Sequence, residues 1–159
     1  MHRRLGKALA LLVCTLGAGV AAVSAWVAWP LPAGMVALDP APAVMLQDRH
    51  GVPLRVTRAH DGSRSRWIPL TEMDPDIIAA FVAVEDRRFF SHWGVDATAA
   101  MRAARDNLAA GRVVSGASTI TMQTARLLRA TPRSWRGKVA QALWALRMEW
   151  GLDKQQILE

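Results

Sequence analysis

Residues 8–29 form a run of 22 amino acids without a formal charge, and this run constrains the fold more than any other feature of the chain. At about 1.5 Å of rise per residue, a helix of this length is roughly 33 Å long, which is enough to cross a hydrocarbon core of about 30 Å. The basic residues nearest to it all precede it, at Arg3, Arg4 and Lys7. Because basic flanks stay on the cytoplasmic side, we expect a cytoplasmic tail over residues 1–7, a single-pass transmembrane anchor over residues 8–29, and all that follows outside the inner membrane.

A cleaved signal peptide is the competing interpretation of the same run. The sequence Val-Ser-Ala before Trp26 resembles a cleavage site, but the apolar core of a signal peptide usually spans only about 7–15 residues. Under either interpretation the remainder of the chain is exported. The single cysteine, Cys14, excludes an intramolecular disulfide and a multi-cysteine zinc cluster in this chain.

The segment after the anchor changes composition twice. Four prolines in residues 30–43 indicate a stiff linker that leaves the membrane. Residues 44–56 then contain two short apolar runs on either side of a turn-forming segment, which predicts a β hairpin. From Asp74 onward the chain shows capping residues and helical spacing, so we expect a mainly α domain over residues 44–159 that begins with a short hairpin.

Capping residues mark five helix starts. Asp74 precedes a proline at the first helical position, and this helix is expected to end at Glu85. Asp96 caps a second helix, which is expected to end at Gly111, and Ser118 or Thr119 caps a third. Ser134 starts a fourth helix, which ends near Trp150. Asp153 starts a fifth, in a capping box with Gln156. The apolar stripes of these helices are expected to form a core, although an incomplete one; two of the stripes are Ala97, Met101, Ala104, Leu108 and Val139, Leu143, Leu146, Trp150.

Positive charge is concentrated in the middle of the chain. The sequence has 20 Lys and Arg against 13 Asp and Glu, a net charge of +7. Residues 87–138 hold ten of the basic residues but only two acids, Asp96 and Asp106. Two interpretations remain open, namely solvated helix faces and a positive field over a site that binds an anion.

Residues 85–96, with the sequence EDRRFFSHWGVD, are the densest cluster of chemically active side chains. Glu85 is expected at the negative end of a helix dipole and beside a second acid, Asp86. Both effects disfavour the ionised form of Glu85, as suits a general base that works near neutrality. The alternative is a pair of exposed acids neutralised by the adjacent arginines.

The same cluster contains three aromatic residues and a histidine. Phe89, Phe90 and Trp93 offer either an apolar wall beside Glu85 or ordinary core packing. His92 is either the partner that orients a carboxylate or a hydrogen-bonded structural histidine.

A second cluster, residues 115–126 with the sequence SGASTITMQTAR, has a turn glycine and two hydroxyls at a helix start. Free N–H groups at such a start favour an anion. Plain N-capping, which contributes about 1 kcal/mol, accounts for the same residues, and the two roles are compatible. The residues of interest here are Gly116, Ser118, Thr119, Gln123 and Arg126.

A third cluster, residues 136–149 with the sequence RGKVAQALWALRME, places a polar stripe on one helix face at Lys138, Gln141, Ala145 and Glu149. A polar stripe opposite an apolar one is typical of any surface helix, so the spacing by itself does not indicate a function.

In this order, the three clusters resemble the signature blocks of the peptidoglycan glycosyltransferases, glycosyltransferase family 51, which form the first extracytoplasmic module of class A penicillin-binding proteins. The first cluster resembles the block Glu-Asp-x-x-Phe-x-x-His-x-Gly, the second Gly-x-Ser-Thr-x-Thr-Gln-Gln, and the third Arg-Lys-x-x-Glu-x-x-x-Ala-x-x-Leu-Glu. The resemblance covers residues 44–159. It implies a lysozyme-like glycosyltransferase lobe that is mainly α and truncated at its C-terminus, since the family continues beyond the final Ile-Leu-Glu.

Three residues depart from these blocks. Met122 replaces the first of the paired glutamines, Gly137 stands where the third block has Arg, and Gln141 stands where it has a second Glu. All three resemble the penicillin-binding protein 1C branch. Because glutamine carries no charge, the charge-dependent or metal-dependent roles of that Glu do not carry over to Gln141.

The resemblance implies polymerisation of lipid II. In this reaction a sugar 4-hydroxyl attacks the anomeric carbon of the growing chain, undecaprenyl pyrophosphate leaves, and a β-1,4 bond forms with inversion. It implies Glu85 as the base, supported in the first block by Asp86, Phe89 and His92, and we expect Glu85 to be poorly solvated opposite a group of cations. The residues implied in binding substrate and pyrophosphate are Gly116, Ser118, Thr119, Gln123, Arg126, Lys138 and Gln141.

The resemblance also implies the partners of the protein. These are lipid II and the lipid-linked glycan chain, the membrane, a moenomycin-type inhibitor, and other proteins of cell-wall synthesis. No cofactor is required, although a divalent cation, Mg²⁺ or Mn²⁺, is compatible with the reaction. No nucleic acid is expected as a partner, because the site faces away from the cytoplasm.

Two other functions remain open at this point. A lytic murein hydrolase would use Glu85 as an acid on finished glycan, as lysozyme-like folds do. A non-catalytic fragment would only bind lipid-linked pyrophosphate, in keeping with Gln141 and a truncated lobe.

Overall fold

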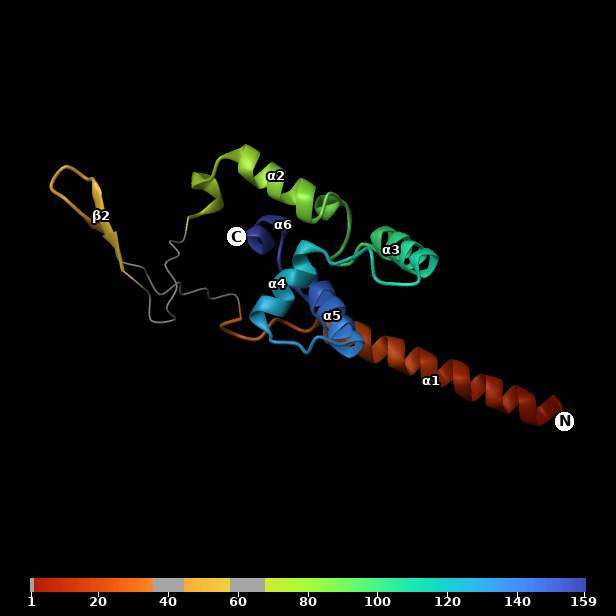
Figure 1. The fold of residues 1–159 in the computed structure, drawn as a ribbon. Coiled ribbons are helices and arrows are strands. Elements are labelled where there is room, and N and C mark those ends of the chain that lie inside the picture. Colours follow the sequence, from red (N-terminus) through yellow and green to blue (C-terminus); the bar gives the residue numbers. More distant parts are fainter. Residues whose placement is uncertain (1, 36–44, 58–67) are drawn as a thin grey trace.

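The computed structural model describes residues 2–35, 45–57 and 68–159 of the protein. Six helices are present in this part of the chain, namely α1 (His2–Ala28), α2 (Pro75–Glu85), α3 (Ala97–Ala110), α4 (Ile120–Leu128), α5 (Trp135–Gly151) and α6 (Lys154–Leu158) (Figure 1). Two short 3-10 helices, η1 (Leu70–Glu72) and η2 (Phe89–Ser91), flank α2, and strands β1 (Met45–Gln47) and β2 (Pro53–Val56) form a hairpin. The mainly α fold class, with one short hairpin and an apolar N-terminal helix, is confirmed.

Helix α1 extends away from the other helices (Figure 1). Its segment Ala10–Ala28 has a mean hydropathy of 2.0, and none of its residues is buried, although its C-terminal end contacts α5. By length and composition this segment is able to cross a membrane. Of the predicted linker, residues 36–43 lie outside the described residues, and the helix itself begins within the predicted N-terminal tail, at His2.

The predicted hairpin is confirmed. Strands β1 and β2 pair in antiparallel orientation, with Met45 opposite Val56. The turn is closed by the Asp48 carboxylate, which accepts hydrogen bonds from the N–H groups of His50 and Val52 at 2.8 and 2.9 Å. The hairpin lies apart from the helices (Figure 1), so it does not contribute to the site below.

Side-chain caps start the helices where the sequence predicted them. Asp74 accepts a hydrogen bond from the N–H of Asp76 at 2.9 Å and so begins α2. Thr119, and not Ser118, caps α4, because its hydroxyl accepts from the N–H of Met122 at 3.1 Å. The caps of α3, α5 and α6 are Asp96, Ser134 and Asp153, the last in a capping box.

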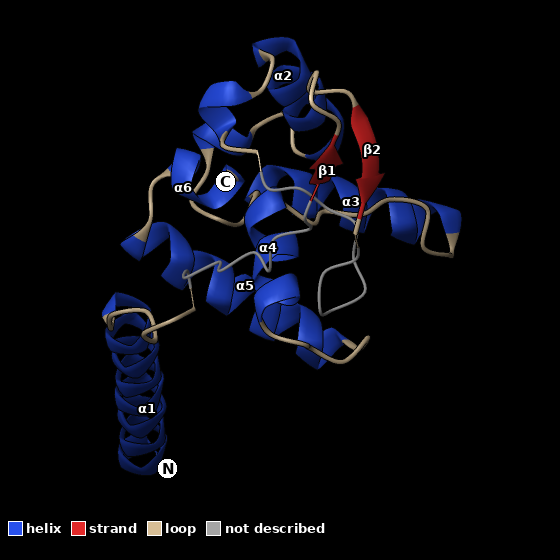
Figure 2. Ribbon diagram, turned by 90° about the vertical axis from the view of Figure 1, so that its left-hand side faces the viewer, coloured by secondary structure: helices blue, strands red, loops and turns tan. Residues whose placement is uncertain are grey.

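The hydrophobic core lies where α2, η2, α4 and α6 meet. Its buried members are Val82, Phe89, Ile120 and Ile157. Helices α4 and α5 pack side by side in the centre, and α1 leaves from one end of the molecule (Figure 2). This arrangement brings the three sequence clusters together around α4.

Two of the predicted apolar stripes do not face this core, so that part of the prediction is wrong. On α3, Met101 and Leu108 are 67% and 83% exposed, and only Ala103 of that helix is buried. On α5, Val139 and Trp150 are also half or more exposed. Two of the buried residues of α5, Gln141 and Ala145, belong instead to the stripe that the sequence marks as polar. Small residues allow close helix packing, and buried polar groups find hydrogen-bond partners inside. The buried residues of α5 are Gly137, Gln141, Ala145, Arg147 and Met148.

Candidate functional site

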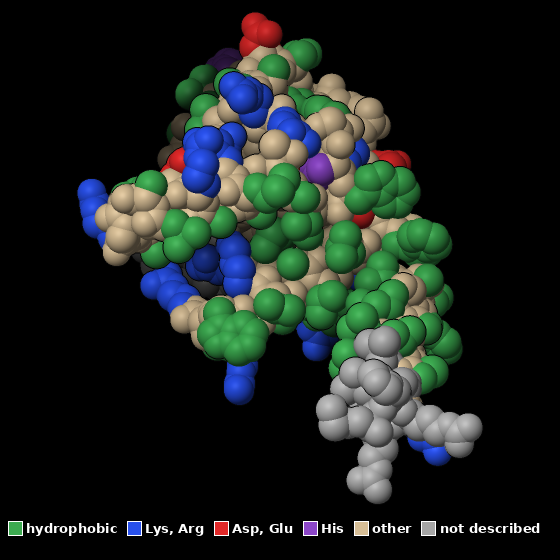
Figure 3. All heavy atoms as spheres, turned by 90° about the vertical axis from the view of Figure 1, so that its right-hand side faces the viewer, with side chains coloured by type: hydrophobic (Ala, Val, Ile, Leu, Met, Phe, Trp, Pro, Cys, Tyr) green, Lys and Arg blue, Asp and Glu red, His purple; other side chains and the backbone are tan. Residues whose placement is uncertain are grey.

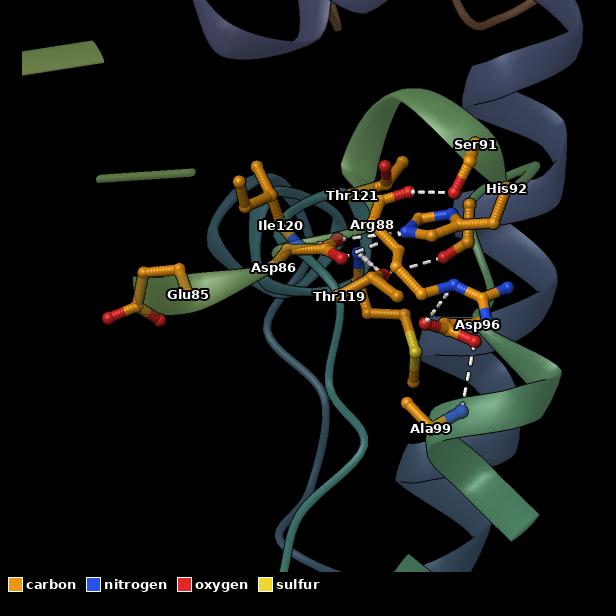
Figure 4. A network of polar contacts seen from close by, with 12 residues as sticks. Glu85, Asp86, Arg88, Ser91, His92, Asp96, Ala99, Thr119, Ile120 and Thr121 are labelled. Carbon is orange, nitrogen blue, oxygen red and sulfur yellow. Dashed lines mark hydrogen bonds and ion pairs between the residues drawn. The ribbon is translucent and has the colours of Figure 1, made fainter. Parts of the chain in front are cut away.

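Asp86 joins the first cluster to the second. It follows the last residue of α2, and its carboxylate points into the molecule (Figure 4). The carboxylate accepts a hydrogen bond from the N–H of Ile120 at 3.0 Å, and both oxygens lie 3.0 Å from Nε2 of His92. Because Ile120 is the first residue of α4, Asp86 places a negative charge at the positive end of that helix. The alternative of an exposed acid neutralised by the adjacent arginines is therefore wrong for Asp86, and His92 is the partner of this carboxylate.

Thr119 makes a second connection between the same clusters. Its hydroxyl donates to the carbonyl oxygen of Gly94 at 2.6 Å while accepting from Met122. Gly94 has a φ of 72°, and a Cβ at this position would lie 2.7 Å from the backbone of Ala145. Only glycine therefore lets this loop approach α5 so closely.

These bonds change the expected role of the α4 start. The N–H groups of Ile120 and Met122 are already bonded to Asp86 and to the Thr119 hydroxyl. These two N–H groups are therefore not free to receive a substrate anion, because a side chain of the protein itself already occupies this part of the helix start.

The third cluster is tied to both of the others through Glu149. Its Oε1 accepts from the Thr121 hydroxyl at 2.7 Å and from Nζ of Lys154 at 2.6 Å. The same Nζ donates to the carbonyl oxygen of His92 at 2.7 Å and lies 4.3 Å from the centre of the Phe89 ring. Sequence reasoning did not single out Lys154, since only the capping box marked its helix.

Glu85 is oriented differently from its neighbour. Its side chain points away from Asp86 (Figure 4), it is exposed, and its Oε2 accepts a hydrogen bond from Nε2 of Gln123 at 2.9 Å. The expectation of a poorly solvated Glu85 is wrong for the free protein. The reason is the non-helical backbone of Asp86, with φ −158° and ψ 74°, which ends α2 and turns the two carboxylates to opposite sides.

The aromatic residues of the first cluster do not form a wall beside Glu85. Phe89 is fully buried in the core, which is the ordinary packing role. Phe90 and Trp93 are exposed, and neither lines the cleft next to Glu85.

A cleft of about 370 Å³ opens beside Glu85, between α2, α3 and the loop before α4. The loop contributes Gly116, Ser118 and Thr119 to its wall, and α3 contributes Arg102. Arg88 and Asp96 also line it, and Nε of Arg88 lies 3.3 Å from the Asp96 carboxylate. The sequence analysis counted Arg88 and Arg102 among the basic residues but did not assign them to the site.

The Asp96 carboxylate keeps its charge in this wall. Burial alone raises the pKa of Asp96, but the hydrogen bond from the Ala99 N–H and the positive charge of Arg88 outweigh burial, so the pKa of Asp96 is lowered. Asp96 therefore both caps α3 and holds the Arg88 guanidinium at the edge of the cleft.

Lys138 reaches the same region from the first turn of α5. Its Nζ donates a hydrogen bond to the Ser118 hydroxyl. Partial desolvation and the positive charge of Arg126 both lower the pKa of Lys138. In the space-filling view, basic side chains border a hollow at the left, beside and apart from the anchor at the lower right (Figure 3). The structure thus brings together eight of the predicted site residues. Five line the cleft, namely Glu85, Asp86, Gly116, Ser118 and Thr119. Gln123 bonds to Glu85, Lys138 bonds to Ser118, and Arg126 acts on Lys138.

Gln141 does not line this cleft. It is buried, and its Nε2 donates to the Thr131 hydroxyl at 2.7 Å, in the loop between α4 and α5. Gly137 supports the same loop, because a Cβ there would lie 2.0 Å from the carbonyl oxygen of Pro132. Two of the departures from the family's blocks therefore hold one loop against α5.

A divalent cation held by the protein does not fit this site. In residues 2–35, 45–57 and 68–159, no three His, Cys, Asp or Glu side chains are grouped so as to hold a metal ion. The acids nearest to Glu85 are already engaged, Asp86 by His92 and Asp96 by Arg88. We therefore assign no step of the reaction to a metal.

Comparison with known proteins identifies the family. Residues 51–159 match the family described as Transglycosylase. Penicillin-binding protein 1C of Escherichia coli (strain K12) is 41% identical over 139 residues, which are 86% of this chain and 18% of that protein. The biosynthetic peptidoglycan transglycosylase of Rhodospirillum centenum (strain ATCC 51521 / SW) is 40% identical over 107 residues, 67% of this chain and 46% of that protein. Penicillin-binding protein 2D of Bacillus subtilis (strain 168) is 40% identical over 99 residues, 62% of this chain and 14% of that protein.

The chain therefore belongs to the transglycosylase family, and the resemblance drawn from its three clusters is confirmed. It spans less than half the length of each of these three relatives. Its apolar N-terminal helix fits a membrane-anchored protein.

Proposed function

We propose that the protein is a peptidoglycan glycosyltransferase that polymerises lipid II into β-1,4-linked glycan strands and releases undecaprenyl pyrophosphate. The observation that carries this proposal is that Glu85 and Ser118 line one cleft from separate elements, while Lys138 of α5 donates a hydrogen bond to Ser118 at its edge. A hydroxyl that attacks a sugar carbon needs a base, and a departing pyrophosphate needs cations and hydrogen-bond donors. The cleft offers both within one site.

Glu85 acts as the base. It takes the proton of the acceptor 4-hydroxyl while the O4–C1 bond forms and the bond from C1 to the phosphate oxygen breaks. In the free protein Glu85 is solvated and held by Gln123. Substrate that fills the cleft displaces this water, and a less solvated carboxylate is a stronger base. Substrate binding, and not an apolar wall of the protein, therefore prepares Glu85 for catalysis.

The pyrophosphate leaves toward Lys138 and Arg126. Partial desolvation and, after it, the positive charge of Arg126 lower the pKa of Lys138, so a bound dianion would relieve the repulsion between the two cations. The Ser118 hydroxyl, which Lys138 holds, is positioned to donate to a phosphate oxygen. Arg88 and Arg102 add positive charge on the other wall of the cleft.

The anchor suits substrates that carry lipid tails. We place the N-terminus in the cytoplasm and the cleft at the outer face of the inner membrane, since the basic residues precede the apolar run. A moenomycin-type inhibitor, which also joins a phosphate to a lipid, is expected to compete for this cleft. Other proteins of cell-wall synthesis are expected partners of the lobe.

Replacement of Glu85 tests the proposal. Glu85→Gln keeps the size of the side chain and an oxygen that can accept from Gln123, but it removes the base. We expect the rate of polymer formation from lipid II by the purified protein to fall by about 100-fold or more. The matched control is Glu72→Gln, which alters an exposed acid of η1 outside the cleft and should leave the rate unchanged.

A rate near that of the wild type in Glu85→Gln would remove Glu85 from the role of base. Incubation of the wild-type protein with purified sacculi separates synthesis from hydrolysis. Release of soluble muropeptides without polymer from lipid II would establish a lytic enzyme instead, and binding of lipid II without turnover would establish a non-catalytic binding module.

A further inference from the structure

Arg147 of α5 is hydrogen-bonded to the end of the anchor helix. The side chain is only 6% exposed. Its Nε donates to the carbonyl oxygen of Trp29 at 3.1 Å, and a terminal nitrogen donates to the carbonyl oxygen of Pro30 at 2.5 Å. These two carbonyls follow directly after Ala28, the last residue of α1.

Two tryptophan rings enclose the same guanidinium. It lies 4.7 Å from the centre of the Trp26 ring and 4.9 Å from that of Trp144. The two rings meet edge to face, with their centres 5.0 Å apart. Trp26 belongs to α1 and Trp144 to α5, so the stack joins the anchor to the lobe through rings and cation as well as through hydrogen bonds.

The charge of Arg147 is balanced by the anchor. No acidic side chain forms an ion pair with Arg147 in the described part of the chain. The Arg147 side chain donates to backbone carbonyls at the negative end of a 27-residue helix, where a cation is favoured. A buried guanidinium is costly unless it is fully hydrogen-bonded. Arg147 therefore depends on the position of α1 for its stability in the interior.

Helix α5 connects Arg147 to the edge of the cleft. Lys138, whose Nζ donates to Ser118, stands nine residues before Arg147 on the same helix, or roughly 13 Å away at 1.5 Å per residue. Ala145, which lies between these two residues on α5, packs against Gly94. Glu149, which follows Arg147, accepts a hydrogen bond from Thr121. The helix is therefore a rigid link between the anchor and the cation site.

We propose that Arg147 is a positioning residue that fixes the anchor to the lobe and so sets the height and tilt of the cleft beside Glu85 above the membrane. This inference rests on the proposed function. Lipid II in a bilayer presents its pyrophosphate at a fixed depth, so a cleft whose orientation is fixed meets it productively. A substrate that is free in solution can approach a cleft at any orientation.

Comparison of two substrates tests the inference. Arg147→Met keeps the apolar stem but removes the charge and all donors. With lipid II embedded in the bilayer of proteoliposomes, we expect its rate to fall about 10-fold or more, since small errors of position are costly in catalysis. With a lipid II analogue whose prenyl tail is short enough to stay in solution, the rate should stay within about 2-fold of wild type, because Arg147 touches neither Glu85 nor Lys138.

Two further variants sharpen this test. Arg129→Met is the matched control, because its guanidinium lies 4.5 Å from the same Trp144 ring but makes no hydrogen bond to the end of the anchor among the described residues. It should leave the ratio of the two rates unchanged. The pair Leu31→Cys and Gly151→Cys, in a Cys14→Ser background, joins two neighbouring positions, since a Cβ added at Gly151 would lie 3.4 Å from Cδ1 of Leu31. Oxidation of this pair to a disulfide should restore the bilayer rate of Arg147→Met.

Equal losses with both substrates would overturn the inference, because a general structural role lowers both rates together. An unchanged bilayer rate in Arg147→Met, or no recovery on oxidation of the cysteine pair, would also overturn it. These results are distinct from failure of the proposed function, which would show as absence of polymer from either substrate with the wild-type protein.

Discussion

The N–H of Ile120 donates a hydrogen bond to the Asp86 carboxylate at 3.0 Å, although the two residues are 34 positions apart in the sequence. This bond sets the end of α2 against the start of α4. Glu85 precedes the acceptor and Ser118 lies just before the donor, so both residues border one cleft. The buried acid of the pair is thus structural, and it leaves the exposed acid free for chemistry.

The first prediction concerns this bond. Asp86→Asn keeps the shape of the side chain but removes the charge that faces His92 and the α4 start. Charge-assisted hydrogen bonds in the interior contribute about 1.5–3 kcal/mol each, and helix-dipole effects add to them, so we expect a loss of about 2 kcal/mol or more in the free energy of unfolding. Urea unfolding in detergent, followed by circular dichroism, measures the loss.

Asp106→Asn is the control for this substitution, because Asp106 pairs with the adjacent and exposed Arg105. Such surface pairs contribute roughly 0–1 kcal/mol. Equal stability of the two variants would show that the Asp86 bond does not hold α2 against α4.

The second prediction is a pH dependence that arises at Lys138. The ammonium form attracts the pyrophosphate, and its pKa is lowered from the ordinary value of 10.5. Polymerisation should therefore be lost as the pH rises through this lowered pKa, earlier than for an ordinary lysine. Lys138→Arg keeps its charge at any accessible pH, so it should move the alkaline limb of the rate profile to higher pH, at some cost in rate near neutrality because a guanidinium has a different geometry.

The measurement is the rate of polymer formation against pH on the alkaline side. Lys7→Arg, which changes a basic residue before the apolar run and far from the cleft, should leave the alkaline limb where it is. The same limb in wild type and in Lys138→Arg would exclude Lys138 as the titrating cation.

The third prediction concerns the loop between α4 and α5. Gly137→Ala places a methyl group 2.0 Å from the carbonyl oxygen of Pro132, so the loop must move. Forcing atoms into a packed site typically costs about 1–3 kcal/mol, which here exceeds the gain of up to about 1 kcal/mol from the better helix propensity of alanine. Thermal unfolding should show a lower midpoint than in wild type.

Gly151→Ala on the same helix provides the comparison. Its new methyl group meets only the Leu31 side chain, at 3.4 Å, so we expect stability equal to or above that of wild type. If Gly137→Ala were as stable as Gly151→Ala, the loop would not be held by close approach at Gly137.

Some features of this fold follow from short stretches of sequence. Asp74, Asp96 and Asp153 were predicted as helix caps, and each accepts a backbone N–H two or three residues further on. Capping is local, because donor and acceptor lie within one turn, so it can be read without knowledge of the fold. The same holds for the hairpin turn at Asp48, whose carboxylate bonds to backbone groups two and four residues away.

Other features escaped prediction because they depend on contacts between distant segments. The stripe of Val139 and Trp150 on α5 is apolar, yet it is exposed, while Gln141 on another face is buried against Thr131. Periodicity identifies a face by composition, but the neighbour that covers it decides burial. Arg147 is the extreme case, since its partners Trp29 and Pro30 precede it by more than a hundred positions.

The uncharged run before Pro30, the helix starts and the three family clusters are properties of neighbouring residues, and for that reason the linear chain was enough to establish them. Which carboxylate of Glu85 and Asp86 faces the cleft, and what neutralises the α4 start, depended on how α2 turns against α4 in space. A backbone turn of one residue sends adjacent side chains to opposite environments, and only packing between remote segments determines which environment is water and which is protein.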